Sequence, residues 1–577
     1  MVVQADRSGA VSRIQPEVGP ASPAPAVEPQ RSVCEALAQH LCDLGVTHAL
    51  GLTGGAVVPL CDALARTPIR VLHCRHESGA AFAATELSLA SGRPVAVFVT
   101  TGPGITNAWT GLLAAWGEGA RVILLSGATS AAQRGRYAMQ ETSRYLGPAI
   151  GSGSVPPLPL SMVIEDPREL ETLAHRLALG CQRETGFVAH IGLPVALQTA
   201  RCPAPLRVAQ PEISVPPCVE VGRYAELLGR EPFLIWLGFG ARHAADSIRA
   251  FAEQTGAHVM SSPRAKGVFP EDHPLYLGLT GMGGHESVTR FYERRRPAYI
   301  LVLGSRLGEL TSFWNPALTP REAFIQVDLD PGVIGIAYPS VKTYGIQADV
   351  GDVVEALRRA MPSTGGDFES VSSLLPPERL EAQDDARIRP SWVMQALQRV
   401  VVDGSDAIVM ADAGNPIPWT AHLLRFRQPR YRASTFVGSM GHSTTGVIGA
   451  ALGRKGKAVA VIGDGSMMMN SEVHTAVQYR IPAVWVVLNN AAYGMVDQGM
   501  RALGFRQVET RFEEVDFAAL ARAQGAGGVR VSRESQLEEA LEKAMRAEGP
   551  FVVDVLIDPE APAPFLRRVT SLKAQGA

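Results

Sequence analysis

The sequence predicts an α/β fold with three domains, each a mostly parallel sheet flanked by helices. Short runs rich in Val, Ile and Leu, without polar alternation, are typical of parallel strands that are buried on both faces. Each run ends in a Gly-containing turn and is followed by a longer helical pattern, as in β-α-β units. The clearest segments are VAVFVTTGPG (95–104), RVILLSGA (121–128), FLIWLGFG (233–240), YILVLGSRLG (299–308), AIVMADAG (407–414) and KAVAVIGDG (457–465).

The chain length and two Pro-rich segments suggest where the domains begin and end. A chain of 577 residues is too long for one hydrophobic core, and three domains of ordinary size fit it. Segments 201–217 and 361–390 have the composition of linkers. We therefore expect a disordered N-terminal tail, three successive domains and a C-terminal tail, at residues 1–30, 31–200, 218–360, 385–560 and 561–577.

Composition excludes several classes of partner. A net charge of −2 gives no reason to expect nucleic acid or an anionic membrane. No apolar run approaches the ~20 residues that a membrane-spanning helix needs. The seven cysteines form no C-x-x-C pair, which favours reduced thiols, and residues 1–30 lack the apolar segment of a secretory signal. We expect a cytoplasmic protein.

Two polar turns in the third predicted domain follow strands that are neighbours along the chain. GDGS (463–466) follows KAVAVI, and Asn489-Asn490 follows IPAVWVVL (481–488). Asp464 and Asn490 are one helix and one strand apart, so both are expected at the same edge of a sheet. Their oxygens suit Mg²⁺, which takes few protein ligands and shares those of a bound diphosphate. Taken alone, GDG also fits a plain turn in which Asp464 caps the next helix.

Several motifs in order along the chain resemble the thiamine-diphosphate (ThDP) enzymes, and acetolactate synthases in particular. GDGS followed by LNNAAYGMV is similar to the cofactor motif of that family, although the spacing is about one residue shorter, with the missing residue expected inside a helix near 469–472. Other matching segments are GLTGGAVVPLCDAL (51–64), RHESGAAFAA (75–84), VTTGPGITNAWTGL (99–112), GRYAMQE (135–141) and GSMGHSTTGVIGAALG (438–453). The implied order is a pyrimidine-binding, a central and a diphosphate-binding domain.

The resemblance implies a set of residues around ThDP and Mg²⁺. Decarboxylation of a 2-oxo acid needs an electron sink that no side chain supplies. Glu77 matches the family Glu that activates the cofactor ring, and Met440 matches the apolar wedge that bends the cofactor. The metal ligands would be Asp464, Asn490 and the carbonyl of Ala492. The implied cofactor-binding positions are Gly54, Gly55, Glu77, Gly414, Asn415, Gly438, Met440, Asp464, Gly465, Ser466, Asn490, Ala492, Tyr493, Gly494 and Met495.

The same resemblance suggests residues near the reacting centre. Gln140 matches a family Gln there, and Met139 replaces the Phe beside it. His442 is a candidate proton donor to a developing alkoxide, although such a His is more often structural. In this family the activating Glu and the diphosphate site belong to different subunits, which implies a homodimer or homotetramer. We expect a substrate pocket formed by Met139, Gln140, Met495 and Gly499.

Two departures from acetolactate synthases suggest a different acceptor. Gly499 stands where that family has a pocket-closing Trp, and a Trp buries ~150–250 Å². Leu310 stands where the family has an Arg that engages the acceptor carboxylate. We therefore predict a carboligase, an acyloin synthase that decarboxylates a 2-oxo acid and adds the acyl anion to a bulky carbonyl acceptor.

Other interpretations stay open. The chain could be an acetolactate synthase, a 2-oxo acid decarboxylase that releases an aldehyde, or a flavin-linked oxidase. A non-catalytic homologue is disfavoured because Glu77 is present. FAD is an additional candidate cofactor, since GFGA (238–241) and GMGG (281–284) stand near family flavin loops, but the missing Arg and an altered loop weaken this case.

Overall fold

The fold is taken from a computed structural model of the chain. The structure describes residues 31–143, 158–202, 220–363, 380–469, 471–506 and 508–565, together with residues 570 and 573. The N-terminal tail expected at 1–30 lies outside the described residues, as do most of both expected linkers and most of the expected C-terminal tail.

The strands form three parallel six-stranded sheets, which confirms the predicted fold class. Val- and Ile-rich runs such as Val95–Val99 are buried along their whole length, because helices cover both faces of each sheet. The first sheet contains β1 (His48–Gly51), β2 (Arg70–His73), β3 (Val95–Val99), β4 (Arg121–Ala128), β5 (Leu160–Val163) and β6 (Phe187–Pro194). The second contains β7 (Leu234–Leu237), β8 (His258–Ser261), β9 (Tyr276–Leu279), β10 (Tyr299–Leu303), β11 (Ala323–Asp328) and β12 (Thr343–Gln347). The third contains β13 (Ile408–Ala411), β14 (Tyr431–Ala433), β15 (Ala458–Gly463), β16 (Ala483–Asn489), β17 (Gly527–Val531) and β18 (Phe551–Leu556).

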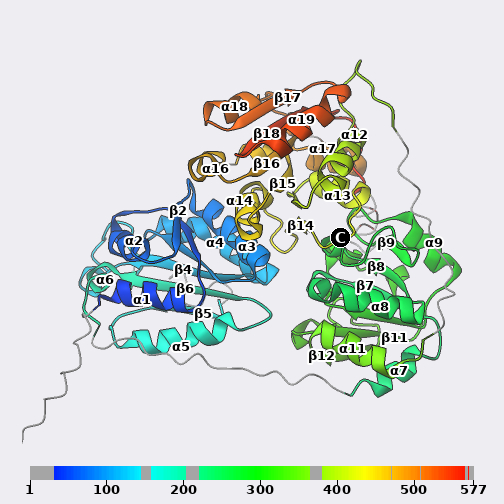
Figure 1. Ribbon diagram of the computed structural model, residues 1–577, viewed down its shortest axis with the longest axis horizontal. Coiled ribbons are helices and arrows are strands. Elements are labelled where there is room, and N and C mark those ends of the chain that lie inside the picture. The colour runs from blue at the N-terminus through cyan, green and yellow to red at the C-terminus, as the bar shows by residue number, and fades with distance from the viewer. Residues whose placement is uncertain are drawn as a thin grey trace, which may run out of the picture.

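Helices connect the strands of each sheet (Figure 1). Those of the first domain are α1 (Val33–Asp43), α2 (Val58–Ala65), α3 (Glu77–Ser91), α4 (Pro103–Glu118), α5 (Glu169–Cys181) and α6 (Val195–Gln198). The central domain has α7 (Gly222–Leu228), α8 (Ala245–Thr255), α9 (Glu286–Arg294), α10 (Glu309–Ser312) and α11 (Val350–Ala360). The third has α12 (Pro390–Leu397), α13 (Pro416–Leu423), α14 (His442–Arg454), α15 (Asp464–Met467), α16 (Val473–Tyr479), α17 (Gly494–Leu503), α18 (Phe517–Ala523) and α19 (Leu537–Arg546).

The first and third sheets share one strand order. The first runs β2-β1-β3-β4-β6-β5 and the third β14-β13-β15-β16-β18-β17, which is the same order along the chain. The central sheet runs β12-β11-β10-β7-β8-β9, with the order reversing between β10 and β7. In open parallel sheets ligands bind beyond the carboxyl ends of the strands, and the Gly-rich turns of this chain follow those ends.

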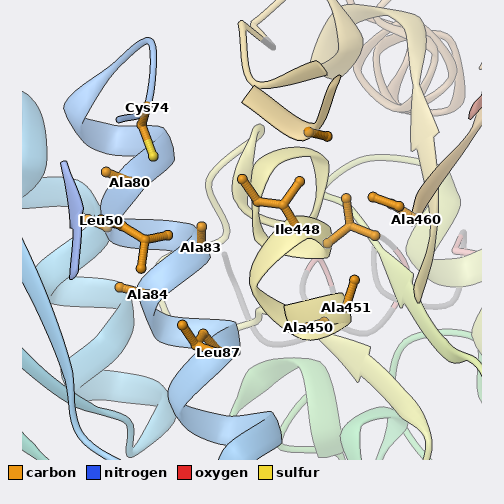
Figure 2. Packing of buried hydrophobic residues seen from close by; sticks show 14 of the residues in the cluster. Leu50, Cys74, Ala80, Ala83, Ala84, Leu87, Ile448, Ala450, Ala451 and Ala460 are labelled. Atoms are coloured by element: carbon orange, nitrogen blue, oxygen red, sulfur yellow. The ribbon is translucent and has the colours of Figure 1, made fainter. Parts of the chain in front are cut away.

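The first and third domains pack together through α3 and α14. Figure 2 shows the small and branched side chains between them, among them Ala83 and Leu87 facing the helix that carries Ile448. A Cβ added at Gly449 would overlap the carbonyl oxygen of Ala83. Small residues therefore allow close backbone approach here, and one hydrophobic core crosses the domain boundary.

Two expectations from composition can be compared with the structure. None of the described helices is both long enough and apolar enough to span a bilayer. The six cysteines in the described ranges are free thiols, as expected for a chain without a disulfide framework. One local expectation was wrong: of residues 469–472, the described ones (469, 471 and 472) lie between α15 and α16 rather than inside a helix, because α15 ends at Met467 and α16 begins at Val473.

Candidate active site

A cavity of about 360 Å³ lies beyond the carboxyl ends of β13, β15 and β16. The turns that follow these strands supply most of its wall, as expected for an open parallel sheet. Eleven of the residues predicted from sequence line it: Gly414, Asn415, Met440, Asp464, Gly465, Ser466, Asn490, Ala492, Tyr493, Gly494 and Met495. Its remaining lining residues are Ala413, Pro416, Gly463, Leu488, Val496 and Ile557.

Asp464 joins the two turns that the sequence placed at one sheet edge. Its Oδ2 accepts the backbone N–H of Asn490 at 2.9 Å and that of Ala492 at 3.3 Å, and its Oδ1 accepts the N–H of Gly465 at 2.7 Å. The side chain is buried, and this burial raises the pKa of the carboxyl above its ordinary value. A cation beside the carboxylate would counter that penalty.

The polar groups of the cavity fit a diphosphate and a hard cation. Ser466 Oγ and Asn415 Oδ1 are buried and, among the described residues, have no hydrogen-bond partner. No group of three or more His, Cys, Asp or Glu in the described part of the chain forms a metal site. A cation here would therefore rely on Asp464, an amide or backbone oxygen and ligand oxygens, which is the ligand set typical of Mg²⁺.

The two adjacent asparagines have different roles. Asn489, at the end of β16, is buried and donates to Asp554 Oδ1 at 2.8 Å and to the carbonyl of Val515 at 2.9 Å. Asn490 lines the cavity. Ala491 follows with a φ of 53°, and this left-handed residue directs the chain back toward Asp464.

Asp412, which follows β13, fixes the start of α14. Its carboxylate accepts the N–H of Gly441 at 2.8 Å, the N–H of Ser443 at 3.0 Å and the hydroxyl of Thr444 at 2.7 Å. These bonds hold the turn that carries Met440 into the cavity wall. Motif comparison had not singled out Asp412; its place directly after an apolar strand is the signal that could have identified it.

Glu77 lies in the first domain, at the first position of α3. It is buried, and its Oε2 accepts a hydrogen bond from Asn107 Nδ2 at 3.1 Å. Asn107, in α4, is a second residue that the motifs did not identify. Gln140 contacts the turn between β3 and α4, where its side-chain oxygen accepts hydrogen bonds from the hydroxyl groups of Thr100 at 3.3 Å and Thr101 at 3.1 Å.

The cavity of one chain contains only part of the predicted site. Seven predicted residues are absent from its described lining besides Glu77: Gly54, Gly55, Met139, Gln140, Gly438, His442 and Gly499. Met139 is 88% exposed, so its side chain extends away from its own chain. The first-domain residues and the cavity residues thus form two separate groups within one chain.

His442 is buried between the first and third domains. Its Nε2 lies 2.8 Å from Glu86 Oε1, and its ring packs against Phe82, 5.0 Å between centroids. Burial alone lowers the pKa of His442, but the hydrogen bond and charge of Glu86 raise it above its ordinary value. Since this His does not line the cavity, its geometry is that of a domain contact, and the proposed proton-donor role gains no support from it.

The glycines of the two candidate flavin loops are accounted for by chain packing. A Cβ at Gly238 would overlap the carbonyl of Gly304, and one at Gly281 would overlap the carbonyl of Leu310. Gly281 and Gly283 also have positive φ values of 65° and 71°. These loops therefore need glycine without any ligand, and FAD stays a prediction.

Known proteins match the chain over all three domains. Residues 31–146, 225–357 and 412–555 match the N-terminal TPP binding, central and C-terminal TPP binding domains of thiamine pyrophosphate enzymes. A putative acetolactate synthase large subunit, IlvB2, of Mycobacterium tuberculosis is 30% identical over 90% of this chain and 96% of its own length.

Two further relatives also match over about nine-tenths of this chain. A probable acetolactate synthase large subunit of Methanocaldococcus jannaschii is 29% identical over 92% of this chain and 93% of its own length. Acetolactate synthase isozyme 2 large subunit of Escherichia coli is 28% identical over 89% and 93%. The chain therefore belongs to the thiamine-diphosphate-dependent enzymes of the acetolactate synthase type, with thiamine diphosphate as cofactor and the Mg²⁺ that is typical of the family.

Proposed function

We propose that this chain is a carboligase that decarboxylates a 2-oxo acid and transfers the acyl anion to a bulky carbonyl acceptor. Thiamine diphosphate, when bound, supplies the electron sink for the decarboxylation. The observation that carries the proposal is the open, apolar character of the wall near α17. A Cβ added at Gly499, in α17 but outside the described cavity lining, would meet no atom within 4 Å, so no atom of this chain occupies the position where a family Trp side chain would begin.

The wall of the cavity suits an apolar acceptor. Met440, Leu488, Met495, Val496 and Ile557 supply its apolar lining. Leu310 and Met495 pack against the same hydrophobic cluster, where a family Arg would bring a positive charge. A small 2-oxo acid acceptor needs a charged partner for its carboxylate, and Leu310 cannot be one. A larger carbonyl compound without a carboxylate fits better.

Residues of the cavity would bind Mg²⁺ and the diphosphate, and Glu77 would exchange a proton with the cofactor. Asp464, the Asn490 amide and the carbonyl of Ala492 would bind Mg²⁺, while Ser466 Oγ and Asn415 would contact the diphosphate. Met440, in the cavity wall, would make the apolar contact with the cofactor. Glu77, which accepts a hydrogen bond from Asn107, would share a proton with the cofactor ring as a general acid and base.

The two groups of site residues favour an active unit of at least two chains. The cavity and Glu77 are separate within one chain, and the family resemblance places them together across a subunit boundary. The exposed apolar side chains of Tyr137 and Met139, 83% and 88% exposed, suit a surface that a second copy covers. We infer that each site combines the cavity of one chain with Glu77 and Gln140 of the other.

Acetolactate synthesis is the second candidate, because the three relatives described above are named as acetolactate synthase large subunits, one of them as probable and one as putative. In that case pyruvate or another small 2-oxo acid would be the acceptor as well as the donor. Leu310 and Gly499 count against it, since they remove the charge and the closing side chain that such an acceptor would meet.

The test is a product assay with the purified chain, thiamine diphosphate and Mg²⁺. A panel of 2-oxo acids is combined with small and bulky aldehydes and ketones, and mass spectrometry identifies the products. We expect mixed acyloins from a 2-oxo acid and a bulky acceptor. Acetolactate from pyruvate alone would favour the second candidate, and free aldehyde alone would identify a decarboxylase; either result would overturn the proposal.

A further inference from the structure

Glu472 is a buried carboxylate that no motif assigned. It is 0% exposed and occupies the N-cap position of α16 in the third domain. Its hydrogen-bond partners include backbone groups of the first domain: Oε1 accepts the N–H of Arg75 and the N–H of His76, both at 2.9 Å. Oε2 accepts the Arg75 N–H at 3.1 Å and the hydroxyl of Thr475 at 2.5 Å.

These contacts fix the residues directly before Glu77. His76 is the N-cap of α3 and has an extended conformation, so the N–H groups of residues 75 and 76 precede the helix and find no helical acceptor. Glu472 satisfies both. The fit is tight, because a Cβ added at Gly79 would lie 2.7 Å from Glu472 Oε1. The first turn of α3, and with it Glu77, is therefore held from the third domain.

Other residues of α16 make further contacts with residues 73 and 75, closer to solvent. The hydroxyl of Tyr479 accepts the N–H of His73 at 2.8 Å, and the Arg75 guanidinium contacts His474 and Gln478. These groups are partly exposed to solvent. Glu472 is the buried member of the set, and removing it would leave the backbone N–H groups of residues 75 and 76 without this acceptor.

We propose that Glu472 is a positioning residue for Glu77: it fixes the backbone of Arg75 and His76 so that the Glu77 carboxylate has one orientation. Asn107 holds the carboxylate itself, and Glu472 holds the chain that carries it. The inference rests on the role proposed for Glu77 in activating the cofactor ring. It adds that the third domain supplies more than the cofactor cavity, since it also sets the geometry of a first-domain catalytic group.

The test compares Glu472→Ala and Glu472→Gln with the control Gln478→Ala, which removes only an outer contact to the Arg75 side chain. The first measurement needs no cofactor: deuterium uptake of the segment 72–80 in the apo protein. We expect faster uptake in this segment for Glu472→Ala, a smaller increase for Glu472→Gln, and uptake like wild type for the control. The amide oxygen of Gln still accepts one N–H. Glu472→Gln therefore replaces Glu472→Ala in both measurements if Glu472→Ala does not fold.

The second measurement is the exchange of the C2 proton of bound thiamine diphosphate. We expect exchange about tenfold to hundredfold slower in Glu472→Ala, because a small displacement of a catalytic group costs this much, with cofactor affinity unchanged. Wild-type exchange rates with wild-type uptake would overturn the proposal. So would a loss of cofactor affinity equal to the loss of rate, with uptake raised throughout the chain, since that pattern indicates a general structural role.

This assay requires no 2-oxo acid and no acceptor. Slow C2 exchange in Glu472→Ala together with no acyloin from the wild-type protein would therefore contradict the carboligase proposal alone. Acyloin formation by the wild type with unaltered C2 exchange in Glu472→Ala would contradict only the positioning role.

Discussion

Asp464 and Asn490 are joined by a hydrogen bond of 2.9 Å from the backbone N–H of Asn490 to the Asp464 carboxylate. This bond brings the turn after β15 and the turn after β16 to one point on the cavity wall. The carboxylate is thereby oriented by the chain itself, so that the cation and diphosphate proposed for this cavity would meet a prepared set of oxygens and N–H groups.

Asp464→Asn should weaken the binding of thiamine diphosphate in the presence of Mg²⁺ by about tenfold to hundredfold, because an interaction with a charged group contributes about 1.5–3 kcal/mol. Calorimetric titration with the cofactor and Mg²⁺ measures the affinity. Asp406→Asn, at an exposed carboxylate paired with Arg454, is the control and should bind like wild type. Equal cofactor affinity for Asp464→Asn and Asp406→Asn would show that Asp464 does not bind the cation.

Mixed dimers test whether the site is shared between chains. Chains carrying Glu77→Gln and chains carrying Asp464→Ala are each expected to be inactive by themselves. A dimer of one chain of each kind has one site with both native residues, so it should recover about half of the wild-type activity per dimer. Differently tagged chains allow the mixed species to be purified and assayed. No recovery would indicate that both residues act within one chain.

Gly499→Trp should restrict the acceptor. A Trp side chain would fill the open space beside Gly499, and we expect the kcat/KM for bulky acceptors to fall about tenfold or more relative to small ones. Gly499→Ala, whose added Cβ meets nothing within 4 Å, is the matched control and should keep the wild-type preference. An unchanged preference between bulky and small acceptors in the Trp variant would show that position 499 in α17 does not select the acceptor.

Gly449→Ala should destabilise the contact between α3 and α14, since the added methyl would overlap the Ala83 carbonyl. Overpacking of this kind costs about 1–3 kcal/mol, which outweighs the gain in helix propensity of up to about 1 kcal/mol. Thermal unfolding should show a lower Tm. Gly456→Ala, where a Cβ meets no atom within 4 Å, is expected to keep the wild-type Tm. Equal Tm values for Gly449→Ala and wild type would show that α3 and α14 can move apart to accept the added methyl group without loss of stability.

Asp554 predicts a pH dependence of stability. It is buried in β18, and burial raises its pKa to about 6, against a partial lowering by Asn489 and Arg530. A raised carboxyl pKa stabilises the folded chain below the unfolded value of 3.8, and this contribution is lost as the pH rises through about 6.

Asp554→Asn has no group that titrates at this position, so it should not lose stability as the pH rises through about 6. Its free energy of unfolding relative to wild type should therefore improve by up to about 3 kcal/mol between pH 4 and pH 8, which denaturant titrations at several pH values can measure. Asp406→Asn is again the control, because the pKa of that exposed carboxyl is lowered and its titration is complete well below pH 6. A pH-independent difference for Asp554→Asn would show that this group is charged throughout.

The sequence by itself determined the three parallel sheets and most of the cavity lining. Buried parallel strands are recognisable from continuous Val and Ile runs, and polar residues directly after such runs must lie at the carboxyl edge of the sheet. For that reason the sequence predicts Asp464 and Asn490 at one sheet edge, and the family resemblance adds Gly414; all three line the cavity.

Only the tertiary structure decided which groups support those residues, because it brings together positions that are far apart in sequence. Glu472 holds the backbone of Arg75 and His76 from nearly four hundred residues away, and His442 pairs with Glu86 rather than lining the cavity. Local pattern carries no information on such contacts, since they depend on how the first and third domains pack.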